Sequence, residues 1–186
     1  MTQSIVVSGP PAVGKTTVAK GLASEFGMEH LSGGDVLKEM AAEEGYEPSG
    51  DDWWDTKQGM QFLARREETP EFDKRLDERL AKLFGRGGMV ITSYTLPWLV
   101  RGGIKIWLDG SHTSSTKRMQ SRDNMTPEEA YAVTKKRYDR NRVLYKNLYG
   151  FDFGGDMSVF DLVIDTDDLG AQQVISKATE MVRGLL

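Results

Sequence analysis

The sequence predicts a three-layer α/β fold in which a mostly parallel, five-stranded sheet lies between helices. Five short apolar runs are spread along the 186 residues, and helical patterns separate them. Strands that alternate with helices need crossover connections, and these make neighbouring strands parallel. A Gly- and Pro-rich turn between the first apolar run and the first helical pattern agrees with such a fold.

The N-terminal part of the chain predicts two strands, each followed by a helix. The run Ile5-Val6-Val7, which ends at Ser8, is typical of a buried strand, and residues 28–31 form the second candidate. Apolar residues at helical spacing predict a helix over residues 15–26, which Gly27 ends. Asp35 is placed to cap a following helix that runs to about Glu44.

The polar middle of the chain predicts two charged helices, at about residues 52–66 and 71–84, split by Thr69-Pro70. Two more strand candidates follow at residues 89–93 and 104–108, joined by a loop around Leu96-Pro97-Trp98. We expect three aromatic residues of this part to serve core or hinge packing, not base stacking: Trp53, Trp54 and Phe62.

The C-terminal part predicts a helical block over residues 114–149, interrupted near Asn124. After this interruption Thr126 is a candidate N-cap, with Pro127 at the first helical position and Glu129 at the third. Residues 160–164 form the last strand candidate and residues 171–186 the closing helix. The chain shows no repeat and no linker, so we expect one domain.

Composition excludes several classes of protein. Lys plus Arg is 24 and Asp plus Glu is 28, a net charge of −4, which argues against a basic nucleic-acid-binding surface. The absence of Cys excludes disulfides and thiolate catalysis, and two His residues exclude a His-rich metal site. No apolar stretch approaches the roughly 18 residues that span a bilayer. We expect a soluble cytoplasmic monomer with no signal peptide and no membrane partner.

The strongest motif is Gly9-x-x-x-x-Gly14-Lys15-Thr16, the P-loop pattern, which lies between a predicted strand and a predicted helix. Glycines let successive N–H groups turn into one concavity, and the helix N-terminus adds partial positive charge there. We expect Lys15 to reach the β/γ-phosphates and the Thr16 hydroxyl to bind Mg²⁺. The predicted nucleotide-binding residues are Gly9, Pro10, Pro11, Ala12, Val13, Gly14, Lys15, Thr16 and Thr17.

A P-loop does not identify the phosphate acceptor. The base-reading Asn-Lys-x-Asp stretch of GTPases is absent, and the chain is short for a large ATPase. Two charged helical excursions favour a small-molecule kinase, which closes over two substrates to exclude water. A nucleotide-binding module without transfer activity and a nucleic-acid-handling ATPase are the alternatives, and size and charge disfavour the second.

Several segments resemble the cytidylate kinases, specifically the archaeal-type branch of the nucleoside-monophosphate kinases. The similar stretches are residues 7–11, 29–35, 69–77, 104–108, 144–152 and 160–166. The resemblance implies a P-loop core (about 1–34, 88–111 and 156–186), a helical monophosphate-binding insert (about 35–87) and a helical lid (about 112–150). The implied reaction is transfer of the γ-phosphoryl group of ATP to CMP or dCMP, with Mg²⁺.

The resemblance also implies site residues. Lys15, Arg118, Arg122 and Arg137 would act in catalysis, and the acceptor would be bound by Ser32, Gly33, Lys38, Asp73, Asp77, Asp139, Arg140 and Arg142. Each has a simpler structural interpretation. The arginines of residues 118–142 can be a solvated basic face, the two acids of residues 73–77 can pair with neighbouring cations, and Ser32 can be an ordinary loop serine.

The chain departs from the family pattern after its third predicted strand. There the family has an acid, a glycine and an arginine that grips the acceptor phosphate, whereas this chain has Thr92-Ser93-Tyr94. Lys38 also stands where the family has an arginine, and a lysine does not replace a bidentate guanidinium. Three outcomes are open: another cation such as Arg101 or a lid arginine fills the gap, activity is weak, or the acceptor differs.

Overall fold

A computed structural model describes residues 3–49, 53, 56–67, 69–123 and 125–186, without the side chains of residues 63, 64, 66, 67, 70 and 122. The strands are β1 (Ile5–Ser8), β2 (Glu29–Ser32), β3 (Met89–Thr92), β4 (Ile104–Asp109) and β5 (Leu162–Asp165). The helices are α1 (Lys15–Phe26), α2 (Gly33–Glu43), α3 (Lys57–Glu67), α4 (Pro70–Gly85), α5 (Leu96–Leu99), α6 (His112–Asp123), α7 (Pro127–Tyr149) and α8 (Ala171–Arg183).

The five strands form one sheet in the order β2-β3-β1-β4-β5, and each neighbouring pair is parallel. This confirms the predicted parallel α/β sheet. Because all strands run the same way, their carboxyl ends meet at one edge. The P-loop follows β1 at that edge, and Ser32 at the end of β2 is in register with Thr92 at the end of β3.

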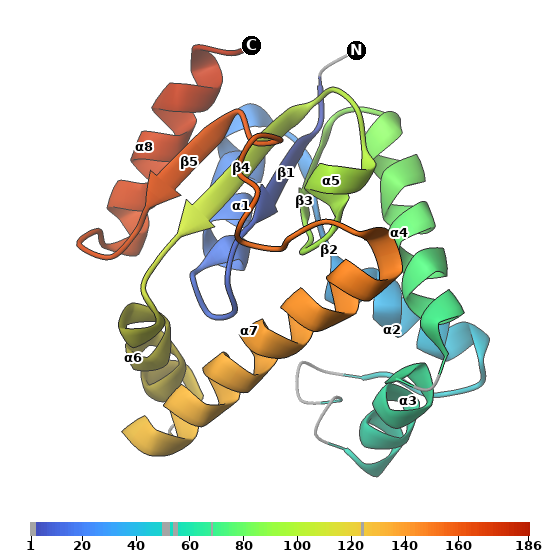
Figure 1. Ribbon diagram of the computed structural model, residues 1–186. Helices are drawn as coiled ribbons and strands as arrows, with labels where there is room; N and C mark the ends of the chain where they lie inside the picture. The colour runs from blue at the N-terminus through green and yellow to red at the C-terminus, as the bar shows by residue number, and fades with distance from the viewer. Residues whose placement is uncertain (1–2, 50–52, 54–55, 68, 124) are drawn as a thin grey trace.

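Helices cover both faces of the sheet because its strands are apolar on both sides (Figure 1). Ile5 and Val7 point to one face, where they pack in a core with α1 and α8. Val6 points to the other face and packs with residues of α2, α4 and α5. On that second face Trp107 of β4 forms a third cluster with Tyr145 and Phe153.

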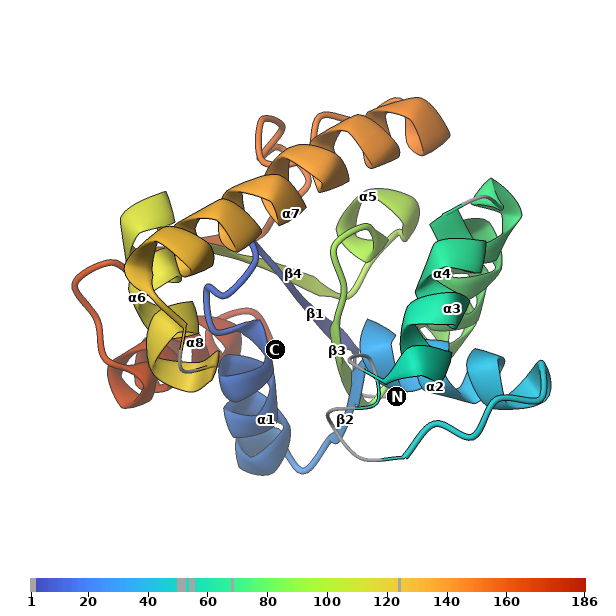
Figure 2. The same ribbon diagram turned by 90° about the horizontal axis from the view of Figure 1, so that it is seen from below.

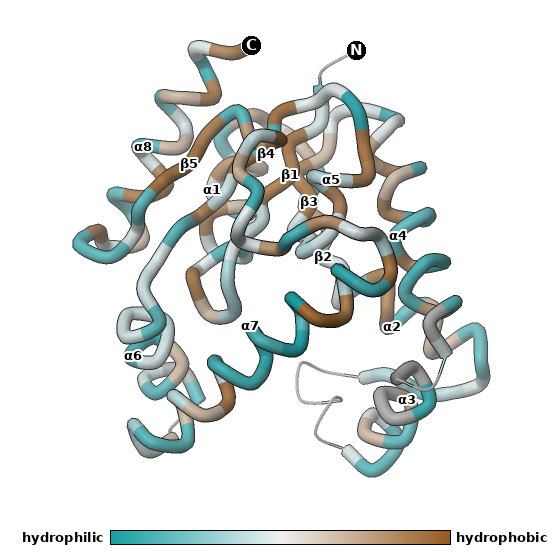
Figure 3. Tube along the Cα trace, in the orientation of Figure 1, coloured by the Kyte–Doolittle hydropathy of each residue, from teal (hydrophilic) through white to brown (hydrophobic). Residues whose placement is uncertain are grey.

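Helix α7 lies across the carboxyl edge of the sheet, from α6 at one side toward α4 at the other (Figure 1, and Figure 2 from below). Figure 3 shows that this helix is mainly hydrophilic, whereas the strands behind it are hydrophobic. A long polar helix over the edge that carries the P-loop therefore faces the region where a ligand of that loop would lie. No helix within the described ranges is long and apolar enough to cross a membrane.

Several predicted boundaries are confirmed. Helix α1 spans residues 15–26 as expected, and Gly27 ends it in the left-handed conformation with φ 63°. Thr126 caps α7: its side chain accepts a hydrogen bond from Glu129 N, and the Glu129 carboxylate accepts one from Thr126 N. Trp53 and Phe62 are buried, as predicted for packing residues, while Trp54 lies outside the described residues.

Three local predictions are wrong. The N-cap of α2 is Ser32, not Asp35, because Asp35 sits at the third helical position and completes a capping box with that serine. The expected loop around Leu96-Pro97-Trp98 is the short helix α5, since the Ser93 hydroxyl accepts hydrogen bonds from the N–H groups of Thr95 and Leu96. The helix expected from residue 52 begins at Lys57.

Candidate active site

The P-loop has the backbone that its glycines predict. Gly9, Ala12 and Gly14 all have positive φ, of 149°, 59° and 101°. A Cβ added to Gly9 would lie 2.4 Å from the Leu108 carbonyl oxygen of β4, so only glycine fits that approach. The turn leads directly into α1, whose first residues are Lys15, Thr16 and Thr17.

The Lys15 ammonium is held inside this loop. Its Nζ donates hydrogen bonds to the Gly9 carbonyl at 3.0 Å and to the Pro10 carbonyl at 2.6 Å. Burial, together with the positive charge of Arg137 on α7, lowers the pKa of Lys15 to about 7. A phosphate beside this ammonium would favour its charged form, and Arg137 is near enough to Lys15 for its charge to affect the same pKa.

Tyr94 takes up the position next to this lysine. The Lys15 ammonium lies over the Tyr94 ring, 4.5 Å from its centroid, a cation–π geometry. The Ser8 hydroxyl donates a hydrogen bond to the Tyr94 carbonyl at 3.3 Å, and the ring also packs on Phe153. The residue that replaces the family arginine is therefore an aromatic support for the P-loop lysine.

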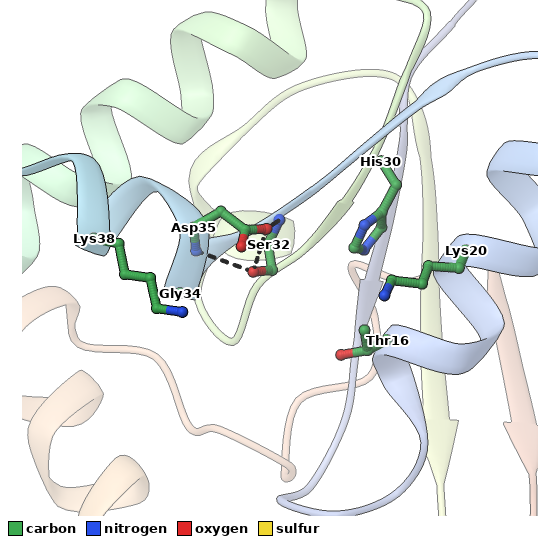
Figure 4. Close-up of a pocket in the computed structure, with 7 residues that line it drawn as sticks. All are labelled: Thr16, Lys20, His30, Ser32, Gly34, Asp35 and Lys38. Carbon is green, nitrogen blue, oxygen red and sulfur yellow. Dashed lines mark hydrogen bonds between the residues drawn. The ribbon is translucent and has the colours of Figure 1, made fainter. Parts of the chain in front are cut away.

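A cavity of about 460 Å³ opens beside the P-loop, and Figure 4 shows the residues that line it. Thr16 and Lys20 come from α1, and His30 and Ser32 from β2. Gly34, Asp35 and Lys38 come from α2. This arrangement brings the predicted magnesium ligand Thr16 together with the predicted acceptor residues Ser32 and Lys38.

His30 is a half-buried residue of this cavity, and its Nε2 atom is buried. Its Nε2 has no hydrogen-bond partner within the described part of the chain. Burial lowers the pKa of His30, and the charge of Lys20 also lowers it, while Asp35 opposes both. Figure 4 shows the imidazole between Lys20 and Ser32. A neutral imidazole in this place can bind a polar ligand that enters the cavity.

The two acids of α4 are buried, and Asp77 has partners outside its own helix. Asp77 accepts a 2.5 Å hydrogen bond from the Thr95 hydroxyl and a 2.6 Å hydrogen bond from the Tyr149 hydroxyl. These contacts tie α4 to the start of α5 and to the last residue of α7. Asp73 is also buried, one turn earlier on the same helix.

The cations expected at the lid are only partly free to face a ligand. Lys135 pairs with Asp139 at 2.7 Å, and Arg142 pairs with Asp152 at 3.3 Å, so acids compensate part of the basic cluster. Arg118 donates a hydrogen bond to the Thr166 carbonyl at 2.6 Å, in the loop between β5 and α8. The Arg122 side chain lies outside the described structure, and Arg140, exposed on the same helix as Arg137, stays a predicted site residue.

Arg101 cannot fill the gap at the acceptor side. It lies in the loop that precedes β4. The strands are parallel, so this loop is at the amino edge of the sheet, opposite to the P-loop. Of the cations proposed for that role, Arg137 alone has a described electrostatic contact with Lys15.

A second cavity, of about 370 Å³, lies on the other side of the P-loop. Its walls are Pro10 and Pro11 of the loop, the end of β4 with Asp109, and side chains of α6 and α7. His112 is among them, and its Nε2 is 3.2 Å from the Thr134 hydroxyl. The P-loop therefore separates two cavities, one bordered by α2 and one by α6 and α7.

A model of the cytidylate kinase-like family matches residues 4–168. The chain therefore belongs to the cytidylate kinase-like family. The cytidylate kinase of Halorubrum lacusprofundi is 33% identical over 174 residues, covering 92% of this chain and 84% of that protein. The cytidylate kinase of Ignicoccus hospitalis is 31% identical over 183 residues, covering 96% and 98%. These findings confirm the resemblance that the motifs indicate.

The solved structures support the same fold. Shikimate kinase from Acinetobacter baumannii superposes with a TM-score of 0.59 at 19% identity, covering 100% of this chain and 95% of that one. At this identity the likeness concerns the fold alone, and it confirms the P-loop kinase type of sheet. The cytidylate kinase-like family assignment thus rests on the sequence comparisons.

Sequence reasoning missed four residues of the site. Lys20 belongs to no motif, and His30 lies in the similar stretch 29–35 without an expected role. Their part in the cavity appears only when β2 and α1 are placed side by side. The sequence shows that Tyr94 stands where the family has an arginine, but it does not show that Tyr94 contacts Lys15. Asp35 is noticed as a helix cap, and its position in the cavity follows from the true N-cap at Ser32.

Proposed function

We propose that this protein is a kinase that transfers the γ-phosphoryl group of ATP to CMP or dCMP. In this reaction a phosphate oxygen of the acceptor attacks the γ-phosphorus, the bond to the bridging oxygen breaks, and ADP leaves. The observation that carries the proposal is the cavity in which Thr16 of the P-loop faces Ser32 and Lys38 of the β2–α2 segment. Family membership supports the pyrimidine monophosphate as acceptor.

The residues have distinct roles in this proposal. The P-loop amides and Lys15 bind the triphosphate, and positioning plus charge neutralisation supply most of the catalysis. Arg137 approaches Lys15 from α7 and would reach the transferring phosphoryl group. Arg118 and Arg122 on α6, with Arg140 and Arg142 on α7, would complete the cationic lid after closure. Ser32, Gly33, Lys38, Asp73, Asp77 and Asp139 remain the predicted acceptor residues.

Magnesium fits this site as an ion that comes with the nucleotide. The described residues contain no group of three or more His, Cys, Asp or Glu side chains able to hold a metal ion. The first cavity nevertheless offers the hydroxyls of Thr16 and Ser32 and the carboxylate of Asp35, which are the oxygen donors that Mg²⁺ prefers. Bound there, the ion would neutralise charge on the β- and γ-phosphates.

The proposed role agrees with a cytoplasmic monomer that binds only small molecules.

A second candidate is a kinase for a different small acceptor. Tyr94 and Thr92 stand where the family has an arginine and an acid, so the acceptor side holds fewer groups for a phosphate dianion. An acceptor that carries less negative charge than a nucleoside monophosphate would fit this side of the site.

An assay of ADP release with ATP and Mg²⁺ over a panel of acceptors tests both candidates. We expect turnover with CMP and dCMP, and expect Lys15→Ala to lower it by several orders of magnitude because charge beside the phosphoryl group is lost. Turnover only with another acceptor would replace the first candidate with the second. Tight ATP binding without turnover on any acceptor would instead identify a nucleotide-binding module.

A further inference from the structure

The first cavity has a lining that favours an anion. Lys20 and Lys38 both belong to it, and among its described lining residues Asp35 is the one acid. The Asp35 carboxylate already accepts hydrogen bonds from the Ser32 N–H at 2.8 Å and from the Ser32 hydroxyl at 2.7 Å. The cavity also borders the start of α2, where the helix N-terminus adds partial positive charge. Positive charge therefore exceeds negative charge around this space.

The two lysines approach the cavity from opposite sides. Figure 4 shows Lys20 on α1 and Lys38 on α2 with their ammonium groups directed toward one another across it. Two like charges repel, and an anion between them offsets that repulsion. The positions three and four residues from Lys20 on its own helix carry no acid: Thr16, Thr17, Ala23 and Ser24. An anion that enters the cavity would therefore be a charge partner for Lys20.

His30 adds a polar atom that lacks a partner. Its Nε2 is buried and makes no hydrogen bond within the described part of the chain. Figure 4 shows the imidazole next to Lys20, whose positive charge acts on the ring. A ring N–H can donate a hydrogen bond to an anionic oxygen, and a partner removes the cost of a buried, unsatisfied group. One phosphate group could accept hydrogen bonds from both side chains.

The size and the place of the cavity suit the phosphate of an acceptor. Its volume of about 460 Å³ lies within the range of roughly 300 to 1,000 Å³ that small-molecule sites have. Thr16 of the P-loop lines one side of it, and the predicted acceptor residue Ser32 lines another. A phosphate held here would lie beside the triphosphate of ATP, as transfer between the two requires.

The end of β3 supplies no cation for that phosphate. The family arginine is replaced by Tyr94, whose ring lies against the Lys15 ammonium. Thr92, the register partner of Ser32, is also uncharged. The positive charge for an acceptor phosphate must therefore come from another element, and α1 and β2 form the opposite wall of the cavity.

We propose that Lys20 and His30 bind the phosphate of the acceptor together with Lys38, and so replace the arginine that is absent at Tyr94. This inference rests on the proposed function. It gives a substrate-binding role to two residues outside the P-loop motif and outside the expected acceptor set. Two ammonium groups and an imidazole from three elements supply the charge and the donors that one guanidinium would supply from β3.

The test compares the affinity for CMP with the affinity for cytidine, which lacks the phosphate. Calorimetry measures both, and the ratio of the two affinities is the phosphate gain. Lys20→Met should lower the phosphate gain about 10-fold or more, because a hydrogen bond between charged groups is lost. The affinities for cytidine and for ATP should stay near those of the wild-type protein. These retained affinities also show that the variant is folded.

Further variants make the result specific. Lys20→Arg keeps the charge and should keep most of the phosphate gain. Lys177→Met removes an exposed lysine of α8, outside the cavity, and is the matched control that should keep the wild-type gain. His30→Leu should lower the gain, and His30→Gln should lower it less, because a glutamine amide can still donate a hydrogen bond. If His30→Leu fails to fold, the Lys20 variants decide.

A wild-type phosphate gain in Lys20→Met would overturn the proposal. Equal losses of CMP and cytidine affinity would also overturn it, because they indicate a distorted cavity. A loss of ATP affinity with an unchanged phosphate gain would do the same, since Lys20 would then act on the triphosphate. The proposed function fails separately: if Lys20→Met loses the phosphate gain but the wild-type protein does not turn CMP over, this phosphate site stands and the kinase assignment does not.

Discussion

At the scale of single residues, Lys15 of the candidate site has a strongly lowered pKa. Its hydrogen bonds go to carbonyls of its own loop, and burial and Arg137 lower its pKa to about 7. A phosphate group next to the ammonium favours the charged form and raises this pKa again. Nucleotide binding is therefore coupled to proton binding at this lysine.

This coupling predicts proton uptake. At pH 8, Lys15 of the free protein is mostly neutral and in the complex it is charged, so ATP binding should take up about one proton. Binding enthalpies measured at that pH in two buffers with different ionisation heats give the number. Lys15→Arg should show none, because arginine stays charged. Equal enthalpies for the wild-type protein in both buffers would contradict the shifted lysine.

Tyr94 should matter through its ring and not through its hydroxyl. Cation–π contacts contribute about 0.5 to 2 kcal/mol, so Tyr94→Leu should lower kcat about 2- to 30-fold by releasing the Lys15 ammonium. Tyr94→Phe keeps the ring and should stay near the wild-type rate. Steady-state kinetics with saturating ATP measures both, and an equal loss in the two variants would implicate the hydroxyl instead.

At the scale of elements, Asp77 joins three helices. It accepts hydrogen bonds from Thr95 beside α5 and from Tyr149 at the end of α7. Burial raises the pKa of Tyr149 strongly, and its hydrogen bond to Asp77 adds to that rise, so this tyrosine remains a neutral donor. These hydrogen bonds of Asp77 therefore fix the C-terminal end of α7 on α4.

Tyr149→Phe should lower the free energy of unfolding by about 1 to 2 kcal/mol, because the buried Asp77 carboxylate loses a donor. In an Asp77→Asn background the same change should cost less, since the charged acceptor is absent. A double-mutant cycle from urea unfolding measures this coupling. Additive losses would show that the two side chains act independently of each other.

The sequence predicted the elements better than the contacts between them. Apolar runs and caps are local signals. The sequence alone therefore predicted the five strands, α1 and the Thr126 capping box of α7. Ser32 and Asp35 lie within one turn, yet which of them is the N-cap depends on where β2 ends. Contacts such as Tyr94 with Lys15 or Asp77 with Tyr149 join distant segments, and no local pattern contains them.

At the scale of the whole molecule, α6 and α7 form one unit over the carboxyl edge of the sheet. Hydrogen bonds of Thr134 with His112 and Thr116 and the contact of His112 with Tyr131 join the two helices. Helix α7 crosses the edge of the sheet that carries the P-loop, as Figure 2 shows, and its Lys135 lines the second cavity together with Pro10 and Pro11 of the loop. We predict that the phosphate groups of two bound substrates attract the cations of this unit.

Closure of this unit on both substrates is the last prediction. With ATP and CMP together, amide hydrogen exchange should slow across residues 112–149 relative to ATP alone, because the lid must exclude water from the phosphoryl group. Helix α8 packs behind the sheet and serves as the internal reference. Lys15→Ala should lack the slowing, since it weakens the triphosphate that the lid cations meet. Unchanged exchange in α6 and α7 of the wild-type protein would mean that these helices are a fixed wall, with catalysis left to the P-loop and Arg137.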